Sequence, residues 1–392
     1  MAAIIICKMK ILYNIAAISN SGGMERVLTN KSNWLSSNGY EVIIVTTDQK
    51  GKPAFFPMNE GIRLYDLGIN YCDNGVDYFL KRLVRYLLKQ IRHRSRLKAL
   101  IDEIKPDIVV SMFGNEALLI AGMHIKAPKL IEFHFCKMMY ILYGRGGLWH
   151  FFDLFRTKLD AYIAKKYDRF VVLTKEDAID WGSGYSNISV IPNALSSFPD
   201  RISSLDKKTV VAIGRLSGQK GFERLIPIWA KVAPKMPDWK LEIIGGGDTE
   251  YKSYLQTMAD NAGVHDSLLF LPPVKNMDEI YMNASVFVMT SKYEGLSMVL
   301  LESQSYGIPA VSFACKCGPR DIIENGVNGF LVEDGDVDLF ASRLETLMRD
   351  AKLRKSMGAK AREKSTGFSE ESIMSRMSCS RILLIQITDN DD

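Results

Sequence analysis

The sequence lacks a long hydrophobic run, a signal peptide and a strong excess of charge of either sign. No apolar run approaches the ~20 residues that a membrane-spanning helix needs. The apolar start of the chain has neither the charged beginning nor the small-residue cleavage site of a signal peptide, so a first strand is expected there. The net charge of +5 over 392 residues argues against a dedicated nucleic-acid-binding protein. We therefore expect a protein that does not cross a membrane and binds no nucleic acid.

The sequence also lacks a recognisable metal site. Its six cysteines are scattered, and only Cys315 and Cys317 lie close together, with no histidine nearby and no second pair. Buried or partly buried free thiols are expected instead, which indicates the reducing cytoplasm. Carboxylates spaced as Asp-x-Asp occur at 336–338, but beyond the last expected strand, where they are interpreted as a solvated helix start. No metal and no other cofactor is predicted.

The length of the chain predicts two domains, because 392 residues exceed what one hydrophobic core usually fills. We expect an N-terminal Rossmann-like domain over 1–195, a polar linker over 196–208 and a C-terminal Rossmann-like domain over 209–368. The tail, 369–392, is expected to return to the N-terminal domain. Residues 1–8 are interpreted as an upstream extension.

Apolar runs alternate with helical patterns and turn residues in both halves of the chain. This alternation predicts an α/β fold in which two doubly wound domains face one interdomain cleft, with ligands bound beyond the carboxyl ends of the strands. The strands are expected at 10–19, 41–47, 62–67, 107–113, 129–135, 168–173, 189–191, 209–213, 241–244, 268–271, 284–289, 310–313 and 329–332. The main helices are expected at 24–38, 78–101, 222–233, 251–262, 277–282, 336–350 and 351–364. The strand-like stretch at 381–388 has no place in this pattern.

The stretch 291–303, SKYEGLSMVLLES, follows an apolar strand and is predicted to begin a helix. Two carboxylates, Glu294 and Glu302, bracket it. At about 1.5 Å of rise per residue, eight helical positions would place Glu302 about 12 Å beyond Glu294, near the span from the sugar to the ribose of a nucleotide sugar. A chance spacing on a helix surface is the alternative.

The helix start within this stretch is predicted to bind phosphate. Gly295 can take a backbone conformation closed to other residues. Leu296, Ser297 and Met298 would then offer the unpaired amides of a first helical turn to an anion.

Two further loops predict contacts with a charged ligand. Arg215 and Lys220 stand in the glycine-rich loop 214–221, where they can neutralise a diphosphate. Two surface cations near a turn are the alternative. The paired glycines Gly22 and Gly23 follow the first expected strand and allow close backbone approach to an anion, although no G-x-G-x-x-G is formed.

The expected helix 78–101 is basic and amphipathic. It carries eight cations and no acid between 80 and 98, with apolar residues interleaved as a stripe. This pattern predicts contact with an anionic membrane surface; a solvated charged face over an ordinary core stripe is the alternative. The segment 136–155 is rich in aromatic residues, which either dock an acceptor with an apolar anchor or close the core of the first domain.

These positions together resemble the retaining glycosyltransferases of family 4, which have the GT-B fold. The resemblance covers nearly the whole chain and is strongest in G-R-L-x-x-x-K-G at 214–221 followed by E-G-L-S-M-V-L-L-E-S at 294–303. Gly22-Gly23, Ile191-Pro192-Asn193 and Gly318-Pro319 add to it. With GGMERV near its start, the chain is similar to bacterial enzymes that assemble capsule, exopolysaccharide or lipopolysaccharide.

The resemblance implies an enzyme that moves a sugar from a UDP- or GDP-type donor to a carbohydrate acceptor, which is lipid-linked at the inner membrane face. Glu302 would accept the ribose hydroxyls, and Glu294 would lie by the donor sugar. Arg215 and Lys220 would replace a metal at the diphosphate. The backbone at Val274 would meet the base.

A histidine near the position of His134 contacts the donor sugar or the reaction centre in related enzymes; a structural histidine is the competing interpretation. Glu132 is the nearest candidate for an inverting base, and its side chain points the same way as that of His134. The family usually ends with a returning helix that carries a tryptophan, which is missing here. A nucleotide-sugar epimerase of the same fold and a non-catalytic nucleotide-sugar-binding protein are the rival functions.

Overall fold

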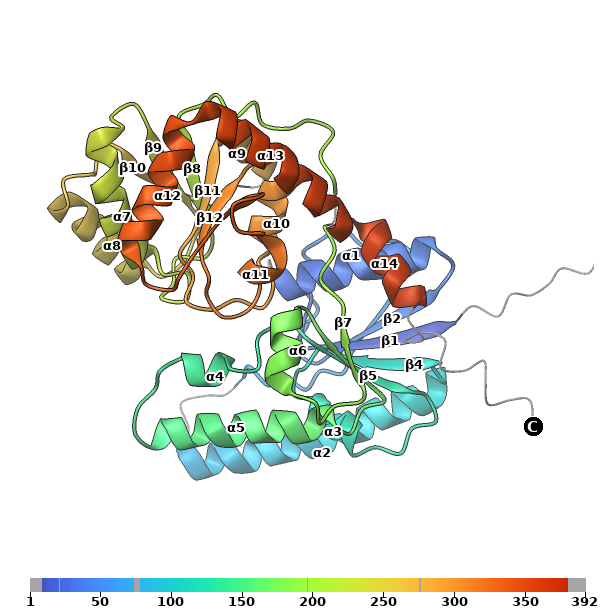
Figure 1. Cartoon of the computed structure of the whole chain (residues 1–392). Helices are drawn as coiled ribbons and strands as arrows, with labels where there is room; N and C mark the ends of the chain where they lie inside the picture. Colours follow the sequence, from blue (N-terminus) through green and yellow to red (C-terminus); the bar gives the residue numbers. More distant parts are fainter. Residues whose placement is uncertain (1–8, 21, 74–77, 196, 275, 380–392) are drawn as a thin grey trace, which may run out of the picture.

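A computed structural model of the chain describes residues 9–20, 22–73, 78–195, 197–274 and 276–379 (Figure 1). Two parallel β-sheets lie one in each half of the chain, with helices packed against them. The expected upstream extension, 1–8, and the strand-like stretch, 381–388, lie outside the described residues. Within the described ranges, no helix is both long and apolar enough to cross a bilayer.

The first sheet has the order β3-β2-β1-β4-β5-β6-β7, which is the doubly wound arrangement of a Rossmann-like domain. Its strands are β1 (Lys10–Ile15), β2 (Glu41–Thr46), β3 (Arg63–Asp66), β4 (Ile108–Ser111), β5 (Lys129–Phe133), β6 (Arg169–Val172) and β7 (Ile188–Val190). The helices of this half are α1 (Gly23–Ser37), α2 (Phe79–Ile104), α3 (Ala117–Ala121), α4 (Met139–Leu142), α5 (Leu148–Ala164) and α6 (Lys175–Trp181).

The second sheet has the order β10-β9-β8-β11-β12-β13, again with parallel neighbours. Its strands are β8 (Thr209–Ile213), β9 (Lys240–Ile244), β10 (Leu268–Leu271), β11 (Val286–Met289), β12 (Ala310–Phe313) and β13 (Gly329–Val332). Its helices are α7 (Phe222–Val232), α8 (Thr249–Asn261), α9 (Met277–Asn283), α10 (Met298–Ser305), α11 (Pro319–Ile322), α12 (Val337–Arg349) and α13 (Ala351–Ser365), followed by α14 (Glu370–Cys379). The predicted fold class, two doubly wound α/β domains, is confirmed.

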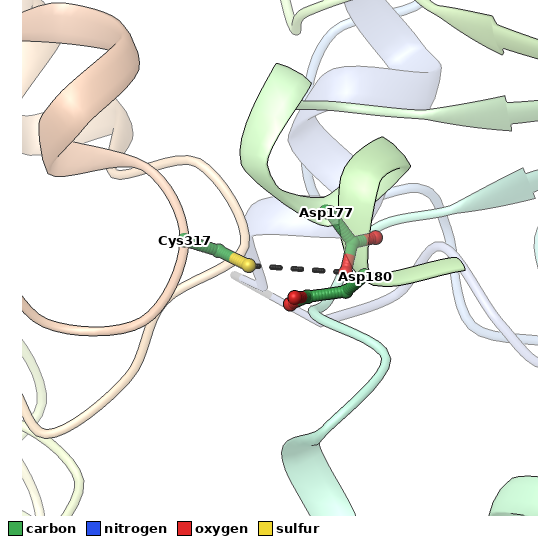
Figure 2. Close-up of side chains that lie close together, drawn as sticks. All are labelled: Asp177, Asp180 and Cys317. Atoms are coloured by element: carbon green, nitrogen blue, oxygen red, sulfur yellow. Dashed lines mark hydrogen bonds between the residues drawn. The ribbon is translucent and has the colours of Figure 1, made fainter. Parts of the chain in front are cut away.

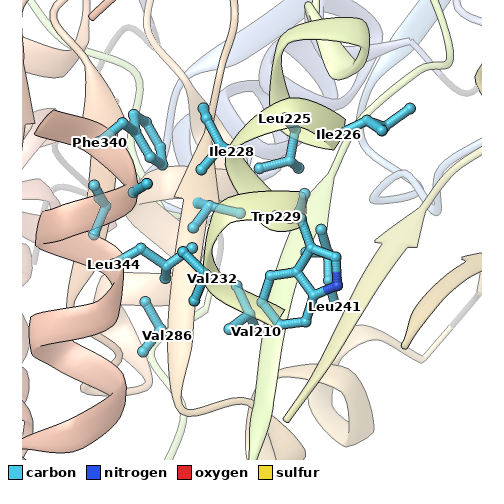
Figure 3. Packing of buried hydrophobic residues seen from close by; sticks show 14 of the residues in the cluster. Val210, Leu225, Ile226, Ile228, Trp229, Val232, Leu241, Val286, Phe340 and Leu344 are labelled. Carbon is cyan, nitrogen blue, oxygen red and sulfur yellow. The ribbon is translucent and has the colours of Figure 1, made fainter. Parts of the chain in front are cut away.

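The core of the second domain shows why these segments fold as they do. On α7, apolar residues recur every three or four positions, so Leu225, Trp229 and Val232 face the sheet together. Figure 3 shows this face packed against Leu241 of β9 and Phe340 of α12. Burying each such side chain contributes about 1.5–3 kcal/mol, which fixes α7 behind the glycine-rich loop.

Several strands end earlier than expected at the edge where ligands bind. β1 ends at Ile15 because the carbonyl of Ala16 accepts hydrogen bonds from the amides of Thr47 (3.0 Å) and Asp48 (2.8 Å) instead of continuing the ladder. β5 ends at Phe133, so His134 lies in the following loop. The loops beyond the strands are therefore longer than the apolar runs indicated.

Within the described residues, the chain passes between the domains near Leu195 and again near Phe368, and these two crossings lie side by side. The amide of Leu195, which precedes the expected linker, donates to the carbonyl of Phe368 at 2.8 Å. Beyond that point α14 packs beside α1 on the first domain (Figure 1). Its buried side chains are Ile373, Met374 and Met377, which belong to the hydrophobic cluster of the first domain.

Candidate active site

A cavity of about 220 Å³ lies between the two domains. The first domain lines it with the loop after β5 and with α4, and the second domain with the loops before α7 and α10. The lining residues are His134, Phe135, Met139, Tyr143, Gln219, Tyr293, Glu294, Gly295 and Leu296. The carboxyl ends of both sheets therefore contribute to one cavity, as expected for doubly wound domains.

Lys220 and Glu294 form an ion pair at this cavity. The Lys220 ammonium lies 2.6 Å from a Glu294 carboxylate oxygen, and both side chains are largely buried. Lys220 runs across Gly214, where a Cβ atom would lie 3.0 Å from its Cε atom. The Glu294 amide donates to the carbonyl of Lys316 at 3.0 Å, which fixes the backbone at the carboxylate. From the sequence, Lys220 was expected at the diphosphate of the donor and Glu294 at its sugar. In the structure, these two side chains contact each other.

Arg215 stands in the same loop as Lys220 but is exposed. Among the described residues, its guanidinium has no hydrogen-bond or ion-pair partner. Its side chain is therefore available to a ligand without breaking an existing contact.

The helix start predicted to bind phosphate is α10. Among the described residues, nothing accepts a hydrogen bond from the amides of Leu296, Ser297 and Met298. The helix begins only at Met298, so Glu294 lies in the preceding loop. The expectation that all eight positions from Glu294 to Glu302 are helical is therefore wrong: only the four steps from Met298 to Glu302 are helical, a rise of about 6 Å.

Glu302 lies on α10 and is held from two sides. The Tyr281 hydroxyl donates to its carboxylate at 2.9 Å, and the Arg26 guanidinium of α1 lies 3.1 Å away. Burial raises the pKa of Glu302, and Arg26 and Tyr281 counter part of that rise. Sequence reasoning missed both partners, although Arg26 belongs to the GGMERV motif it singled out.

The remaining donor-site predictions lie at loop ends. Gly22 and Gly23 mark the start of α1, and the Gly22 carbonyl accepts from the Arg26 amide at 3.1 Å. The two glycines therefore open α1, the helix whose Arg26 pairs with Glu302 of the second domain. Val274 is half-buried beyond β10 and packs against the cluster that contains Tyr281.

His134 is bonded to an acid of its own domain. Its Nε2 lies 3.1 Å from the Glu132 carboxylate, and only 5% of the His134 side chain is exposed. The Lys31 ammonium of α1 lies 2.7 Å from the same carboxylate. Although burial acts to raise it, Lys31 and His134 lower the pKa of Glu132 to about 2. The imidazole Nδ1 is buried and has no partner among the described residues.

Gly295 meets His134 across the domain boundary. A Cβ atom at position 295 would collide with the His134 carbonyl oxygen and would lie 3.1 Å from the Cα of Phe135. Only glycine fits this approach. The loop before α10 is therefore pressed directly against the loop after β5.

A second contact between the domains joins α6 to the loop before α11. Figure 2 shows Cys317 of this loop facing Asp177 and Asp180 of α6, with its sulfur 3.8 Å from an Asp177 oxygen. Candidate ligand atoms of these three residues lie within 4.8 Å of one another. Asp180 is already paired with the Lys316 ammonium at 3.0 Å, and Asp177 accepts the indole N–H of Trp181 at 3.1 Å. Protein donors thus bind one oxygen of Asp180 and both oxygens of Asp177, while Asp180 Oδ2 is buried without a partner among the described residues. The absence of a metal requirement stays a prediction.

Two family models match the chain. Residues 21–196 match the model described as Glycosyltransferase Family 4, and residues 197–364 match Glycosyl transferases group 1. An uncharacterized glycosyltransferase of Haemophilus influenzae is 30% identical over 369 residues, which are 93% of this chain and 98% of the relative. The amylovoran biosynthesis glycosyltransferase AmsD of Erwinia amylovora is 29% identical over 377 residues, covering 94% and 98%.

Solved structures share the fold. The crystal structure of TarM aligns with a TM-score of 0.76 at 17% identity, covering 94% of this chain and 98% of TarM. The apo form of the lipopolysaccharide outer core galactosyltransferase WaaB aligns with a TM-score of 0.69 at 22% identity, covering 94% and 98%. Anabaena HepE, solved with UDP and glucose, gives a TM-score of 0.71 at 15% identity, covering 97% and 100%.

Proposed function

The chain belongs to the family 4 glycosyltransferases, and from this membership we propose that it transfers a sugar from a nucleotide diphosphate sugar to a carbohydrate acceptor during assembly of a bacterial surface polysaccharide. Its relatives include AmsD and a lipopolysaccharide 1,6-galactosyltransferase of Salmonella typhimurium, which is 25% identical over 360 residues. A UDP-type donor is favoured because HepE, of the same fold, was solved with UDP and glucose.

The observation that carries the proposal is the arrangement on one wall of the cleft. Lys220, Glu294 and the unbonded amides that open α10 lie together where a diphosphate and its sugar would fit. As the glycosidic bond breaks, negative charge develops on the diphosphate, and Lys220 and Arg215 would stabilise it in a partly desolvated site. Glu294 would then be released toward the sugar hydroxyls, and Glu302 would accept from the ribose.

Retention of configuration is proposed from what the first domain brings to the cavity. Among its described residues, the lining contributed by this domain contains no carboxylate. Glu132 is buried beneath His134 and bound to Lys31, and its pKa of about 2 makes it a poor base. An inverting enzyme needs a base on this side, so front-side attack with retention fits better. The anomeric configuration of the product, read by proton NMR, tests this.

Peripheral contact with an anionic membrane is proposed for the side of the first domain that carries α2 and α5, opposite the second domain (Figure 1). The apolar stripe of α2 is exposed over 83–91, with Ile91 at 68%, so it is not an ordinary core stripe there. The α5 aromatics are likewise outside the core: Phe151 is 69% exposed. Apolar side chains beside exposed cations fit a membrane interface and an acceptor with a lipid anchor.

The function is tested first by a thermal-shift panel of UDP-, GDP- and ADP-sugars, because a ligand that binds only the folded state raises its apparent stability. The sugar that stabilises the protein is then offered with polysaccharide-precursor acceptors, with and without EDTA. Transfer in EDTA supports a metal-independent glycosyltransferase. Loss of donor without an acceptor would indicate an epimerase, and binding with no nucleotide release on any acceptor would indicate a binding protein.

A further inference from the structure

Two cysteines from different domains pack against each other at the cleft. Cys136 lies in the loop after β5 and is 1% exposed, and Cys317 lies in the loop before α11 and is 0% exposed. Together with Tyr293 they form one buried cluster. Both are free thiols. A pair of adjacent thiols, one on each domain, is not required by sugar transfer.

The surrounding structure aligns the two loops that carry these thiols. One carboxylate oxygen of Asp177 accepts the Lys137 amide at 2.8 Å, next to Cys136, and also faces the Cys317 sulfur at 3.8 Å (Figure 2). The Cys317 amide donates to Glu176 at 3.1 Å. Cys317 also has a positive φ of 59°, a backbone conformation that is uncommon outside glycine.

We propose that Cys136 and Cys317 are a disulfide site that joins the two domains when the cell is oxidised. Hydrogen peroxide or an equivalent two-electron oxidant takes the electrons. One thiol, as thiolate, attacks peroxide to give a sulfenic acid and water, and the other thiol displaces the sulfenic oxygen as a second water. The sum is two thiols and one peroxide giving one disulfide and two waters. Contact with Cys136, together with burial, raises the pKa of the Cys317 thiol, so the thiolate that attacks peroxide forms when the domains part and the site opens to water.

The disulfide would hold the cleft closed. Lys316, next to Cys317, bridges to Tyr293, and its carbonyl accepts the Glu294 amide at 3.0 Å. On the other side, Cys136 lies two residues from His134. A covalent bond here would fix both walls of the donor cavity and prevent the domain separation that exchanges nucleotides. The disulfide itself is independent of the proposed function, whereas its effect on transfer depends on that function.

The experiment uses the full chain, reduced and then freed of reductant. After treatment with hydrogen peroxide, peptide mapping without reduction is expected to show the peptides of Cys136 and Cys317 joined, with the loss of two hydrogens. The transfer rate is expected to fall about tenfold or more and to return with dithiothreitol. The transfer rates of Cys136→Ser and Cys317→Ser should not fall after the same hydrogen peroxide treatment. The matched control is Cys315→Ser, a buried thiol of the same loop, which should behave like the parent.

The outcomes separate the two parts of the proposal. Absence of the joined peptide in the oxidised parent, or joining of Cys315 instead, would overturn the disulfide site. A joined peptide with undiminished transfer would overturn the lock while leaving the disulfide established. If the protein transfers no sugar, the release rate of pre-bound nucleotide sugar is measured instead of the transfer rate. Release from the oxidised protein that is as fast as from the reduced protein would overturn the lock. Cys317→Ala serves if either serine variant fails to fold.

Discussion

The Lys220 ammonium lies 2.6 Å from the Glu294 carboxylate, so the cation proposed for the diphosphate and the acid proposed for the sugar neutralise each other. A bare cation and a bare acid buried in this cavity would each carry a desolvation cost. Their pairing holds both side chains in place. Under the proposed function, binding of a diphosphate would exchange one partner of Lys220 for another and would free Glu294 at the same moment.

Removing the charge of Lys220 or Arg215 should lower the turnover rate by more than it weakens substrate binding. Lys220→Ala and Arg215→Ala are each expected to reduce kcat about 10²–10³-fold, with a smaller change in KM, because they act on charge that develops in the transition state. Steady-state kinetics with the donor found in the panel measures this. The control is Lys292→Ala, whose ammonium pairs with Glu223 at 2.8 Å outside the cavity lining. Transfer at the parent rate by both variants would refute the diphosphate assignment.

Glu302→Gln should weaken donor binding. Loss of charged hydrogen bonds to the ribose is expected to raise the Kd for the nucleotide about 10–100-fold, measured by calorimetry. Glu279→Gln makes the same change on exposed α9 and should leave the Kd unaltered. Arg26→Ala removes a partly exposed ion pair, worth about 1 kcal/mol or less, and should change the Kd by less than tenfold. Equal affinities of Glu302→Gln and the parent would place the ribose elsewhere.

The Lys31–Glu132 pair should control the stability of the first domain and its dependence on pH. Lys31→Met leaves a buried carboxylate without its cation and is expected to cost about 3–5 kcal/mol. Calorimetry measures this, with exposed Lys52→Met as the control.

The sign of the pH effect follows from the pKa of Glu132. Because its folded value, about 2, lies below the usual 4.5, the stability contributed by Glu132 is complete above about pH 4.5 and is lost as the pH falls toward 2. In Glu132→Gln, the free energy of unfolding should lack this pH-dependent contribution. An unchanged acid transition in that variant would show that other groups cause it.

The membrane proposal depends on exposed cations of α2. Lys89 is unsuitable for the test because its ammonium donates to the carbonyl of Asn70 at 2.5 Å. Arg82 and Arg92 are exposed, so Arg82→Gln/Arg92→Gln is expected to reduce the fraction that sediments with anionic vesicles at low salt severalfold, at about 1 kcal/mol per cation.

The matched control for this test carries the same charge change on the second half of the chain, Lys207→Gln/Lys352→Gln, two exposed lysines. Neutral vesicles should bind the parent weakly. Equal sedimentation of the parent and the α2 variant would leave that helix as ordinary surface.

Local patterns in the sequence were enough for the order of the strands and for the loops at the cleft, but they did not predict the helix α5, Leu148–Ala164. Apolar runs marked strands such as β11, and Gly295 marked the loop that meets the first domain. The expected helical path from Glu294 to Glu302 was wrong because the helix starts at Met298, after the glycine, and a periodic pattern does not show where backbone bonding begins.

Contacts between distant parts of the chain could not be found in this way. Arg26 reaches Glu302, and Lys31 reaches Glu132, through the assembled fold, and nothing in the spacing of these residues indicates it. The aromatics of α5 show the same limit, because composition alone does not distinguish an apolar residue of the core from one on the surface.

The two crossings of the chain between the domains are joined by the hydrogen bond from Leu195 to Phe368. Two tethers joined at one point would let the domains swing apart but resist their sliding past each other. Leu195 lines the same small pocket as Arg26 and Glu302, so the acid proposed to accept the ribose lies beside these tethers. Under the proposed function, a nucleotide would be held at its ribose while the domains are apart, and closure would complete the site around its sugar.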